Sequence, residues 1–344
     1  MYDVIIIGAG PVGLYTARLL EKRLRVLVID SNKEIGKKAC SGLYSTKLED
    51  FVPIKKEWID NKVRKAVLHS PSGNKLNLRK KNTAAYVVDR EKFNKYLAKN
   101  IKSRILLGTR VKNIISKPDR MVVITDKASL ESRMVIGCGG ANSVVRKHFG
   151  VSPKEMINGL IAITQEDGSS DFVEMWFDKK IITDGFFWKI PRGKTTEYGA
   201  FGKNVNFKQL EDFFKLKKYE KRAAIIPTGP CRTYFDRALL IGDAAGITKP
   251  WSFGGVIYGF HCAKIASRVV FDAFEKNNFS GNFLKAYERG WKKTVGRSIR
   301  LGLIGRAVFK KMNNKQIDLL FGRFGKTGFL NKMDMDFPLL AVFG

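Results

Sequence analysis

The first thirty residues constrain the fold of this 344-residue chain more than any other stretch. Residues 2–7 have the composition of a buried parallel strand, and residues 14–20, beyond a glycine-rich turn, have the apolar period of a helix. A second apolar segment, 25–29, ends at Asp30, whose carboxylate is a natural acceptor for ribose hydroxyls. Strand, turn, helix and strand in this order predict a βαβ unit that binds a dinucleotide.

Each residue of the turn has a predicted part in that unit. Gly8 permits the tight turn, Gly10 lets the backbone approach a pyrophosphate, and Gly13 lets the helix lie close to the strand. Pro11 has no N–H to lose at the first helical position. The amides of the first helical turn, which includes Val12, form an anion site at the positive end of the helix. The alternative is a glycine-rich turn in some other α/β fold.

Length and composition indicate a globular chain with room for two domains, since 44% of its residues are hydrophobic and only ten are proline. No apolar run approaches the roughly eighteen residues of a membrane-spanning helix, and the N-terminal strand leaves no room for a signal peptide. We therefore expect a cytoplasmic protein. The four cysteines form no CxxC pair and the three histidines are scattered, so no metal site is predicted.

The net charge of +31, from 63 basic and 32 acidic residues, is the strongest compositional bias. A field of this sign attracts phospholipid headgroups, nucleic acid or phosphorylated substrates. The alternative is that lysine merely keeps the surface soluble, because the excess is spread over the whole chain. One segment, 288–326, is denser, with eleven Lys or Arg residues against Glu288 and Asp318.

The whole pattern predicts an α/β fold with a Rossmann-like cofactor domain, a β-rich substrate domain and a helical C-terminal region. The expected domains are 1–150 plus 225–282 for the discontinuous cofactor domain, 151–224 for the substrate domain and 283–344 for the helical region. The hairpin at 62–80 belongs either to the first domain or to the substrate domain. Within the substrate domain we expect strands at 172–177, 185–190 and 197–201, then a basic amphipathic helix from 207 to about 221.

Six segments together resemble a known family. They are Gly8–Gly13, Ala39–Gly42, Val88–Phe93, Gly137–Arg146, Gly242–Gly246 continued to Gly255, and Gly185–Pro191. In this order they resemble flavoproteins of the para-hydroxybenzoate hydroxylase fold, and most of all the archaeal and plant geranylgeranyl reductase family. The resemblance covers most of the chain and is more specific in the first domain than in the substrate domain.

The resemblance implies FAD as the cofactor and assigns residues to it. Asp243, after Gly242, would accept hydrogen bonds from the flavin ribityl chain, and a helix N-cap is the alternative role. Backbone amides at Gly254 and Gly255 would face the negative charge of a reduced flavin. Arg90 would reach the phosphate or ribityl oxygens, and a surface cation is its alternative.

Three residues are candidates on the substrate side. Cys40 would position the substrate or donate a proton, or it is a buried structural cysteine. Trp188 and Phe186 alternate along one strand and share a face, where they line an apolar tunnel for an isoprenoid or simply belong to the core.

The sequence also departs from the family pattern. Gly139 stands where an Asp is usual, and in the hydroxylases that Asp belongs to a segment serving NADPH, so direct nicotinamide use is in doubt. Phe186, Ile190 and Thr183 replace a Tyr, a Phe and a Pro of the substrate motif. Phe253 replaces the first of three glycines.

The resemblance implies a reductase that adds hydride and a proton to isolated double bonds of geranylgeranyl chains in membrane-lipid precursors. Catalysis rests on the cofactor and on orientation. A flavin hydroxylase of the same fold is the enzymatic alternative, and a basic membrane- or nucleic-acid-binding adaptor is the non-enzymatic one. A transient donor, NAD(P)H or a reduced carrier, would supply electrons.

The dense basic segment carries an apolar stripe with a four-residue spacing, made of Trp291, Val295, Ile299, Leu303 and Ala307. Such a stripe beside cations suits a helix on an anionic membrane, and the expected location is then peripheral on the inner membrane face. A helix packed on the core with a solvated basic face is the alternative. Nucleic-acid binding is ranked lower, because no binding module accompanies the charge.

Overall fold

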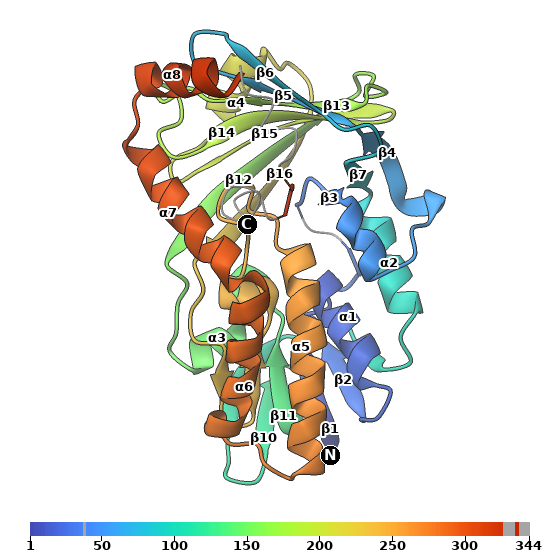
Figure 1. Cartoon of the computed structure of the whole chain (residues 1–344). Helices are drawn as coiled ribbons and strands as arrows, with labels where there is room; N and C mark the ends of the chain where they lie inside the picture. Colours follow the sequence, from blue (N-terminus) through green and yellow to red (C-terminus); the bar gives the residue numbers. More distant parts are fainter. Residues whose placement is uncertain (37–38, 326–333, 337–344) are drawn as a thin grey trace. The chain divides into compact units, whose positions relative to one another are not determined.

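The computed structural model describes residues 1–36, 39–325 and 334–336 (Figure 1). Their contacts form two compact units. The first comprises residues 1–36, 91–156 and 227–300, and the second comprises 39–90, 157–226 and the described part of 301–344. This grouping places 39–90 with the substrate strands rather than with the first domain. The predicted domain boundaries otherwise stay a prediction.

The first unit is built on an eight-stranded sheet with the order β17-β18-β11-β1-β2-β8, to which β10 and β9 are added beside β11. Val4, Ile5 and Ile6 of β1 are fully buried, as expected of a central parallel strand. The strands of this unit are β1 (Tyr2–Ile7), β2 (Val26–Ile29), β8 (Arg104–Leu106), β9 (Val111–Ser116), β10 (Met121–Thr125), β11 (Ser129–Gly137), β17 (Tyr234–Phe235) and β18 (Ala238–Leu240).

Helices of the first unit pack on this sheet, and α5 lies along α1 (Figure 1). The close approach is possible because Gly259 of α5 meets the Val12 side chain. The helices that lie in this unit or begin or end in it are α1 (Pro11–Leu20), α2 (Arg90–Lys99), α3 (Val144–His148), α5 (Val256–Glu275), α6 (Gly281–Trp291) and α7 (Arg297–Lys311), with a π-helical turn at Lys292–Gly296 and 3-10 turns at Gly140–Asn142 and Gly242–Ala245.

The second unit contains a seven-stranded sheet with the order β16-β12-β15-β14-β13-β5-β6 and a three-stranded sheet with the order β3-β7-β4. The hairpin β5–β6 joins the larger sheet through a parallel pairing of β5 with β13. The elements are β3 (Leu43–Ser45), β4 (Ile59–Val63), β5 (Lys65–His69), β6 (Lys75–Arg79), β7 (Ala85–Val88), β12 (Glu155–Thr164), β13 (Phe172–Trp176), β14 (Phe186–Arg192), β15 (Thr195–Gly202), β16 (Glu220–Thr228), α4 (Phe207–Phe214), α8 (Asn314–Gly325) and 3-10 turns at Thr46–Asp50 and Lys56–Trp58.

The larger sheet has two different faces because side chains alternate along each strand. Phe187, Tyr198 and Ala200 pack beneath α4 in one apolar cluster. Ile190 and Trp188 belong to a second cluster with the smaller sheet. We call these the Lys189 face and the Trp188 face, after one residue of β14 on each.

These elements confirm the predicted class, a Rossmann-like α/β part with β-rich and helical parts. One predicted helix is too long. Helix α4 ends at Phe214, because Lys215 adopts the left-handed conformation (φ 57°), and residues 220–228 form strand β16 instead. The predicted helical region 283–344 is helical from 283 to 325 except at residues 312 and 313, and residues 326–333 and 337–344 lie outside the described residues.

The apolar stripe of the basic segment is largely internal. Trp291, Val295 and Ile299 are at most 3% exposed. The Trp291 indole N–H donates to Thr233 Oγ1 at 3.0 Å. The packed-helix alternative therefore holds for these three residues, and the prediction that they face lipid is wrong. Among the described residues, no helix is both long and apolar enough to span a membrane.

Candidate active site

Four parallel strands of the first unit, β18, β11, β1 and β2, end at one edge of the sheet. Several of the predicted cofactor residues follow these ends, which is where open α/β sheets bind ligands. Arg90 instead belongs to the second unit. Gly8 follows β1 and Asp30 follows β2, while Gly242 and Asp243 follow β18. The fold therefore gathers at one edge segments that are more than 200 residues apart in sequence.

The glycine turn fits a pyrophosphate. Gly8 has φ 116°, and a Cβ there would lie 2.4 Å from the Cys138 carbonyl oxygen. A Cβ on Gly13 would lie 1.9 Å from the Gly8 carbonyl oxygen, so helix α1 requires glycine at this point. A Cβ on Gly10 meets no atom within 4 Å. The open space at Gly10 is what a bound pyrophosphate needs, and Pro11 begins the helix as predicted.

Asp30 is tied to this turn. Its Oδ2 accepts a hydrogen bond from the Ala9 amide at 2.7 Å, and its Oδ1 accepts one from the Asn32 amide at 2.8 Å. The carboxylate is thus held in place beside the glycine turn. Its contact with a ribose stays a prediction.

Asp243 lies against the start of α5. A Cβ on Gly255, the N-cap residue of this helix, would come within 2.2 Å of Asp243 Oδ1. Glycine is therefore needed for the carboxylate to approach, and a negative charge is favourable at the helix N-terminus. The side chain of Val12 lies between the two motifs, within 3.4 Å of a Cβ at Gly242. Asp243 is not itself an N-cap residue, since Ile241 caps the 3-10 turn and Gly255 caps α5. Its contact with the flavin stays a prediction.

In the second unit, Arg90 contacts the thiol of Cys40, the candidate residue on the substrate side. Its Nη1 donates to Cys40 Sγ at 3.0 Å and to the Tyr44 hydroxyl at 2.5 Å. Arg90 and Tyr44 are both buried, and burial raises the pKa of the Tyr44 phenol well above its usual range although the Arg90 charge opposes this. Tyr44 is therefore a neutral phenol at physiological pH. The predicted contact of Arg90 with flavin stays a prediction.

Phe186 and Trp188 share a face of β14 as predicted, with their ring centroids 6.4 Å apart. Phe201 of β15 packs edge-on against Phe186 at 4.3 Å. The Trp188 ring lies over Gly199, where a Cβ would be 2.1 Å from it. These rings form an aromatic wall, and Phe177 extends it at 5.2 Å from Phe186.

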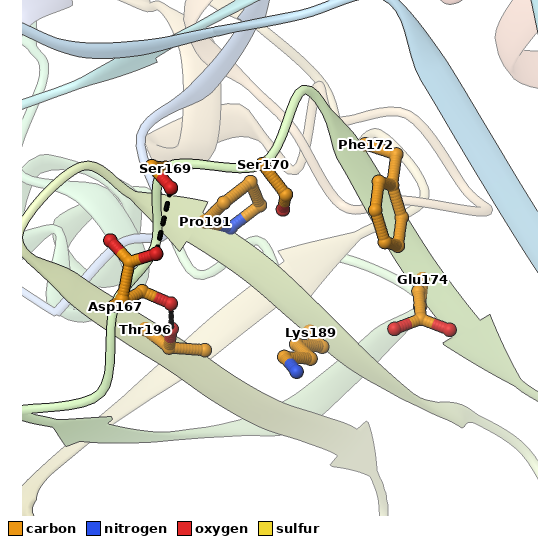
Figure 2. A pocket seen from close by; sticks show the side chains of 8 residues that line it. All are labelled: Asp167, Ser169, Ser170, Phe172, Glu174, Lys189, Pro191 and Thr196. Carbon is orange, nitrogen blue, oxygen red and sulfur yellow. Dashed lines mark hydrogen bonds between the residues drawn. The ribbon is translucent and has the colours of Figure 1, made fainter.

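The opposite, Lys189 face of the sheet carries a polar pocket, shown in Figure 2. It is lined by Asp167, Ser169, Ser170, Phe172, Glu174, Lys189, Pro191 and Thr196. Six of these eight residues are charged or carry a hydroxyl group, so burying an isoprenoid chain here would leave polar groups without water. On the Trp188 face, Phe186 and Phe201 are only 8% and 3% exposed and Trp188 packs on a buried cluster, as the core alternative expects. The role of Phe186 and Trp188 in lining a substrate tunnel stays a prediction.

Sequence reasoning missed three residues near the candidates, namely Tyr44, Arg192 and Glu197. Glu197 is fully buried and accepts a hydrogen bond from the Trp188 indole N–H at 2.9 Å. In the sequence, Glu197 is a single acidic residue in the aromatic strand that we expected at 197–201. A side chain that faces solvent would account for an acid there equally well, so its burial could not be predicted. Tyr44 and Arg192 gave no signal, because their partners are distant in the chain.

All four cysteines are thiols. Among the residues that the structure describes, no cluster of three or more His, Cys, Asp or Glu side chains is arranged to hold a metal ion. The arrangement at the sheet edge instead suits an anionic dinucleotide.

Comparison with known proteins gives the class and then the family. A model described as an FAD binding domain matches residues 1–198, which include the glycine turn and Asp30. The protein is an FAD-dependent oxidoreductase. The chain belongs to the family that carries this FAD binding domain.

Relatives confirm the resemblance to geranylgeranyl reductases. A digeranylgeranylglycerophospholipid reductase of Methanocaldococcus jannaschii is 26% identical over 95% of this chain and 91% of its own length. An uncharacterized protein of the same organism is 30% identical over 97% of this chain and 92% of its own length. The crystal structure of a geranylgeranyl bacteriochlorophyll reductase-like protein from Thermoplasma acidophilum superposes with a TM-score of 0.90 over 99% of this chain and 95% of that chain. The two sequences are 21% identical, so this similarity shows a shared fold.

Proposed function

We propose that this flavoenzyme saturates isolated double bonds of geranylgeranyl chains in membrane-lipid precursors. The observation that carries the proposal is the FAD binding domain matched over residues 1–198, joined in the second unit by the packed aromatic residues Phe186, Trp188 and Phe201. The digeranylgeranylglycerophospholipid reductase similar to this chain supports it.

When bound and reduced by an electron donor, FAD would supply a hydride to one alkene carbon, and a proton would complete the saturation at the other carbon. The residues of this chain bind the cofactor and the substrate and orient them toward each other. The turn at Gly8–Gly13 and the carboxylate of Asp243 hold the cofactor, while Trp188 and Phe186 hold the isoprenoid chain. We assign Cys40, fixed by Arg90, to positioning the substrate or giving the proton. The electron donor, NAD(P)H or a reduced carrier, binds transiently.

Expressing the protein in a host that makes geranylgeranyl lipids, and analysing the extracted lipids by mass spectrometry, tests this function. We expect lipid extracts to gain two hydrogens for each saturated bond when the protein is expressed. A Gly10→Ala variant, expected to bind FAD more weakly, serves as the matched control and should saturate fewer bonds at the same expression level. Lipids that gain oxygen atoms instead would indicate the hydroxylase alternative. Unchanged lipids, with colourless purified protein, would favour the adaptor.

We also propose that the enzyme binds an anionic membrane peripherally, from the cytoplasmic side. Four apolar side chains on α7 and α8 are exposed: Ile304 (58%), Val308 (57%), Leu319 (73%) and Leu320 (38%). Lys311, Lys315 and Arg323 of the same helices are exposed as well. Exposed apolar residues among cations suit an interface with anionic lipid, and the lipid substrate requires access to a membrane.

Sedimentation with vesicles tests this location. We expect binding to anionic phospholipid vesicles and little binding to zwitterionic ones. Leu319→Asp should weaken binding by about tenfold or more, because burying a leucine side chain contributes about 1.5–3 kcal/mol. Ile225→Asp, at a residue of β16 that is 47% exposed, is the control and should bind like the parent protein. Equal binding by both variants would refute the role of α8.

A further inference from the structure

Arg192, at the end of β14, is the centre of a buried network in the second unit. Its side chain is 9% exposed, and its guanidinium lies between two carboxylates. Nη1 donates to Glu197 Oε2 at 3.1 Å, and Nη2 donates to Asp60 Oδ2 at 2.8 Å. The two acids come from β15 and β4, so one side chain joins the larger sheet to the smaller one.

The same guanidinium also bonds to the backbone of two other segments. Nη1 donates to the Ser41 carbonyl at 2.6 Å, and Nη2 donates to the Val88 carbonyl at 3.0 Å. Ser41 directly follows Cys40, and Val88 lies two residues before Arg90. Arg192 thus fixes the backbone on both sides of the Arg90–Cys40 contact.

Glu197 extends the network to the aromatic wall. Its Oε1 accepts the hydrogen bond from Trp188, while its Oε2 accepts from Arg192. Both oxygens of this buried carboxylate are therefore engaged as acceptors, and Glu197 is not placed to donate a proton. Burial raises the pKa of Glu197, and Arg192 opposes this rise.

The geometry of the network requires a guanidinium. Four acceptors lie around two nitrogens in a planar fork, which the compact ammonium of lysine does not reproduce. A buried ion pair is weak evidence that the pair stabilises the fold, because the cost of removing both charges from water offsets their attraction. We therefore look for the role of the Arg192–Glu197 pair in fixing the positions of the residues that it contacts.

We propose that Arg192 and Glu197 are positioning residues that hold Cys40 and Trp188 in fixed places on the substrate side of the enzyme. The Arg192–Glu197 ion pair fixes the positions of both side chains. Arg192 holds the backbone next to Cys40 through the Ser41 carbonyl, and Glu197 holds the Trp188 indole through its carboxylate. The catalytic consequence rests on the proposed function, whereas the positioning itself does not.

Alkylation of Cys40 in the absence of substrate tests the positioning. Iodoacetamide labelling, followed by peptide mass mapping, gives the rate at Cys40 with Cys231 as the internal reference. We expect Arg192→Lys to change the Cys40 rate several-fold and to leave the Cys231 rate unchanged. Arg64→Lys removes the guanidinium of an exposed pair with Asp171 in the same unit, and it should change neither rate.

A Cys40 rate equal to that of the parent protein in folded Arg192→Lys would overturn the proposal. If Arg192→Lys does not fold, Glu197→Gln, which keeps the side-chain volume, is measured in its place with the same criterion. In turnover with a geranylgeranyl lipid, we expect kcat to fall by about tenfold or more in Arg192→Lys at unchanged FAD content. Unaltered kcat with an altered labelling rate would retain the positioning and contradict its catalytic role.

Discussion

The contrast between Gly10→Ala and Gly13→Ala tests whether the glycine turn is built for a ligand or only for the fold. Gly13 contributes to packing, because a Cβ would lie 1.9 Å from the Gly8 carbonyl oxygen, a backbone atom that cannot swing aside. Gly10 has an ordinary extended conformation (φ −71°, ψ 174°), and its Cβ would meet nothing within 4 Å. The two substitutions therefore have opposite expected effects on the apo protein.

The magnitudes follow from these distances. For Gly13→Ala, overpacking costs about 1–3 kcal/mol or more, and the helix propensity of alanine returns about 1 kcal/mol, so we expect a net loss of unfolding free energy. For Gly10→Ala, the smaller freedom of the unfolded chain contributes about 0.4–1 kcal/mol of stability. A methyl group that obstructs one charge-assisted hydrogen bond costs about 1.5–3 kcal/mol, which weakens FAD affinity about tenfold or more.

Urea unfolding of the deflavinated protein and titration with FAD measure both effects. We expect Gly10→Ala to unfold no more easily than the parent protein and to bind FAD more weakly. Gly13→Ala should unfold more easily. A destabilised apo Gly10→Ala, or one with parental FAD affinity, would refute the assignment of Gly10 to the pyrophosphate.

Three further outcomes are expected. Gly255→Ala should lower FAD affinity, because its Cβ would collide with Asp243 Oδ1 at 2.2 Å, and parental affinity in a titration would contradict this. Burial lowers the pKa of Lys179 from 10.5 to about 8, opposed by the Asp184 carboxylate and reinforced by the charges of Arg306 and Lys310. The unfolded chain then binds more protons between these values, so stability should rise from pH 8 to 10.5 in chemical unfolding, and Lys179→Met should lack that part of the rise. Burial raises the pKa of the Cys262 thiol to about 12, so iodoacetamide at neutral pH should label Cys262 only after unfolding, as peptide mapping can show.

Local patterns made the first unit predictable. The turn Gly8–Gly13, its flanking strands and Asp30 lie within thirty residues, and Gly8 and Gly13 have steric reasons within the fold that the spacing of the motif expresses. The motif at Asp243 was found by resemblance, and the parallel order of the strands then placed it at the same edge of the sheet. The alternation of Phe186 and Trp188 also followed from strand geometry alone.

The remaining features depend on contacts that spacing does not encode. Arg192 meets Ser41, Asp60 and Val88, each more than 100 residues away in the chain. Which face of the basic helices is buried depends on the elements that they pack against. The four-residue spacing of apolar residues therefore fitted a stripe that faces lipid and a stripe that faces the core equally well. Helix α4 stopped early because residues 220–228 have a strand partner in β12.

The central claim, that this protein transfers reducing equivalents from FAD to a geranylgeranyl chain, is tested most directly by an anaerobic titration. The purified flavoprotein is reduced chemically, the reductant is removed, and a geranylgeranyl phospholipid is added. We predict that the oxidised flavin spectrum returns in proportion to the bonds saturated, as counted by mass spectrometry of the lipid. A flavin that stays reduced with this lipid and reoxidises only when oxygen is admitted would contradict the claim.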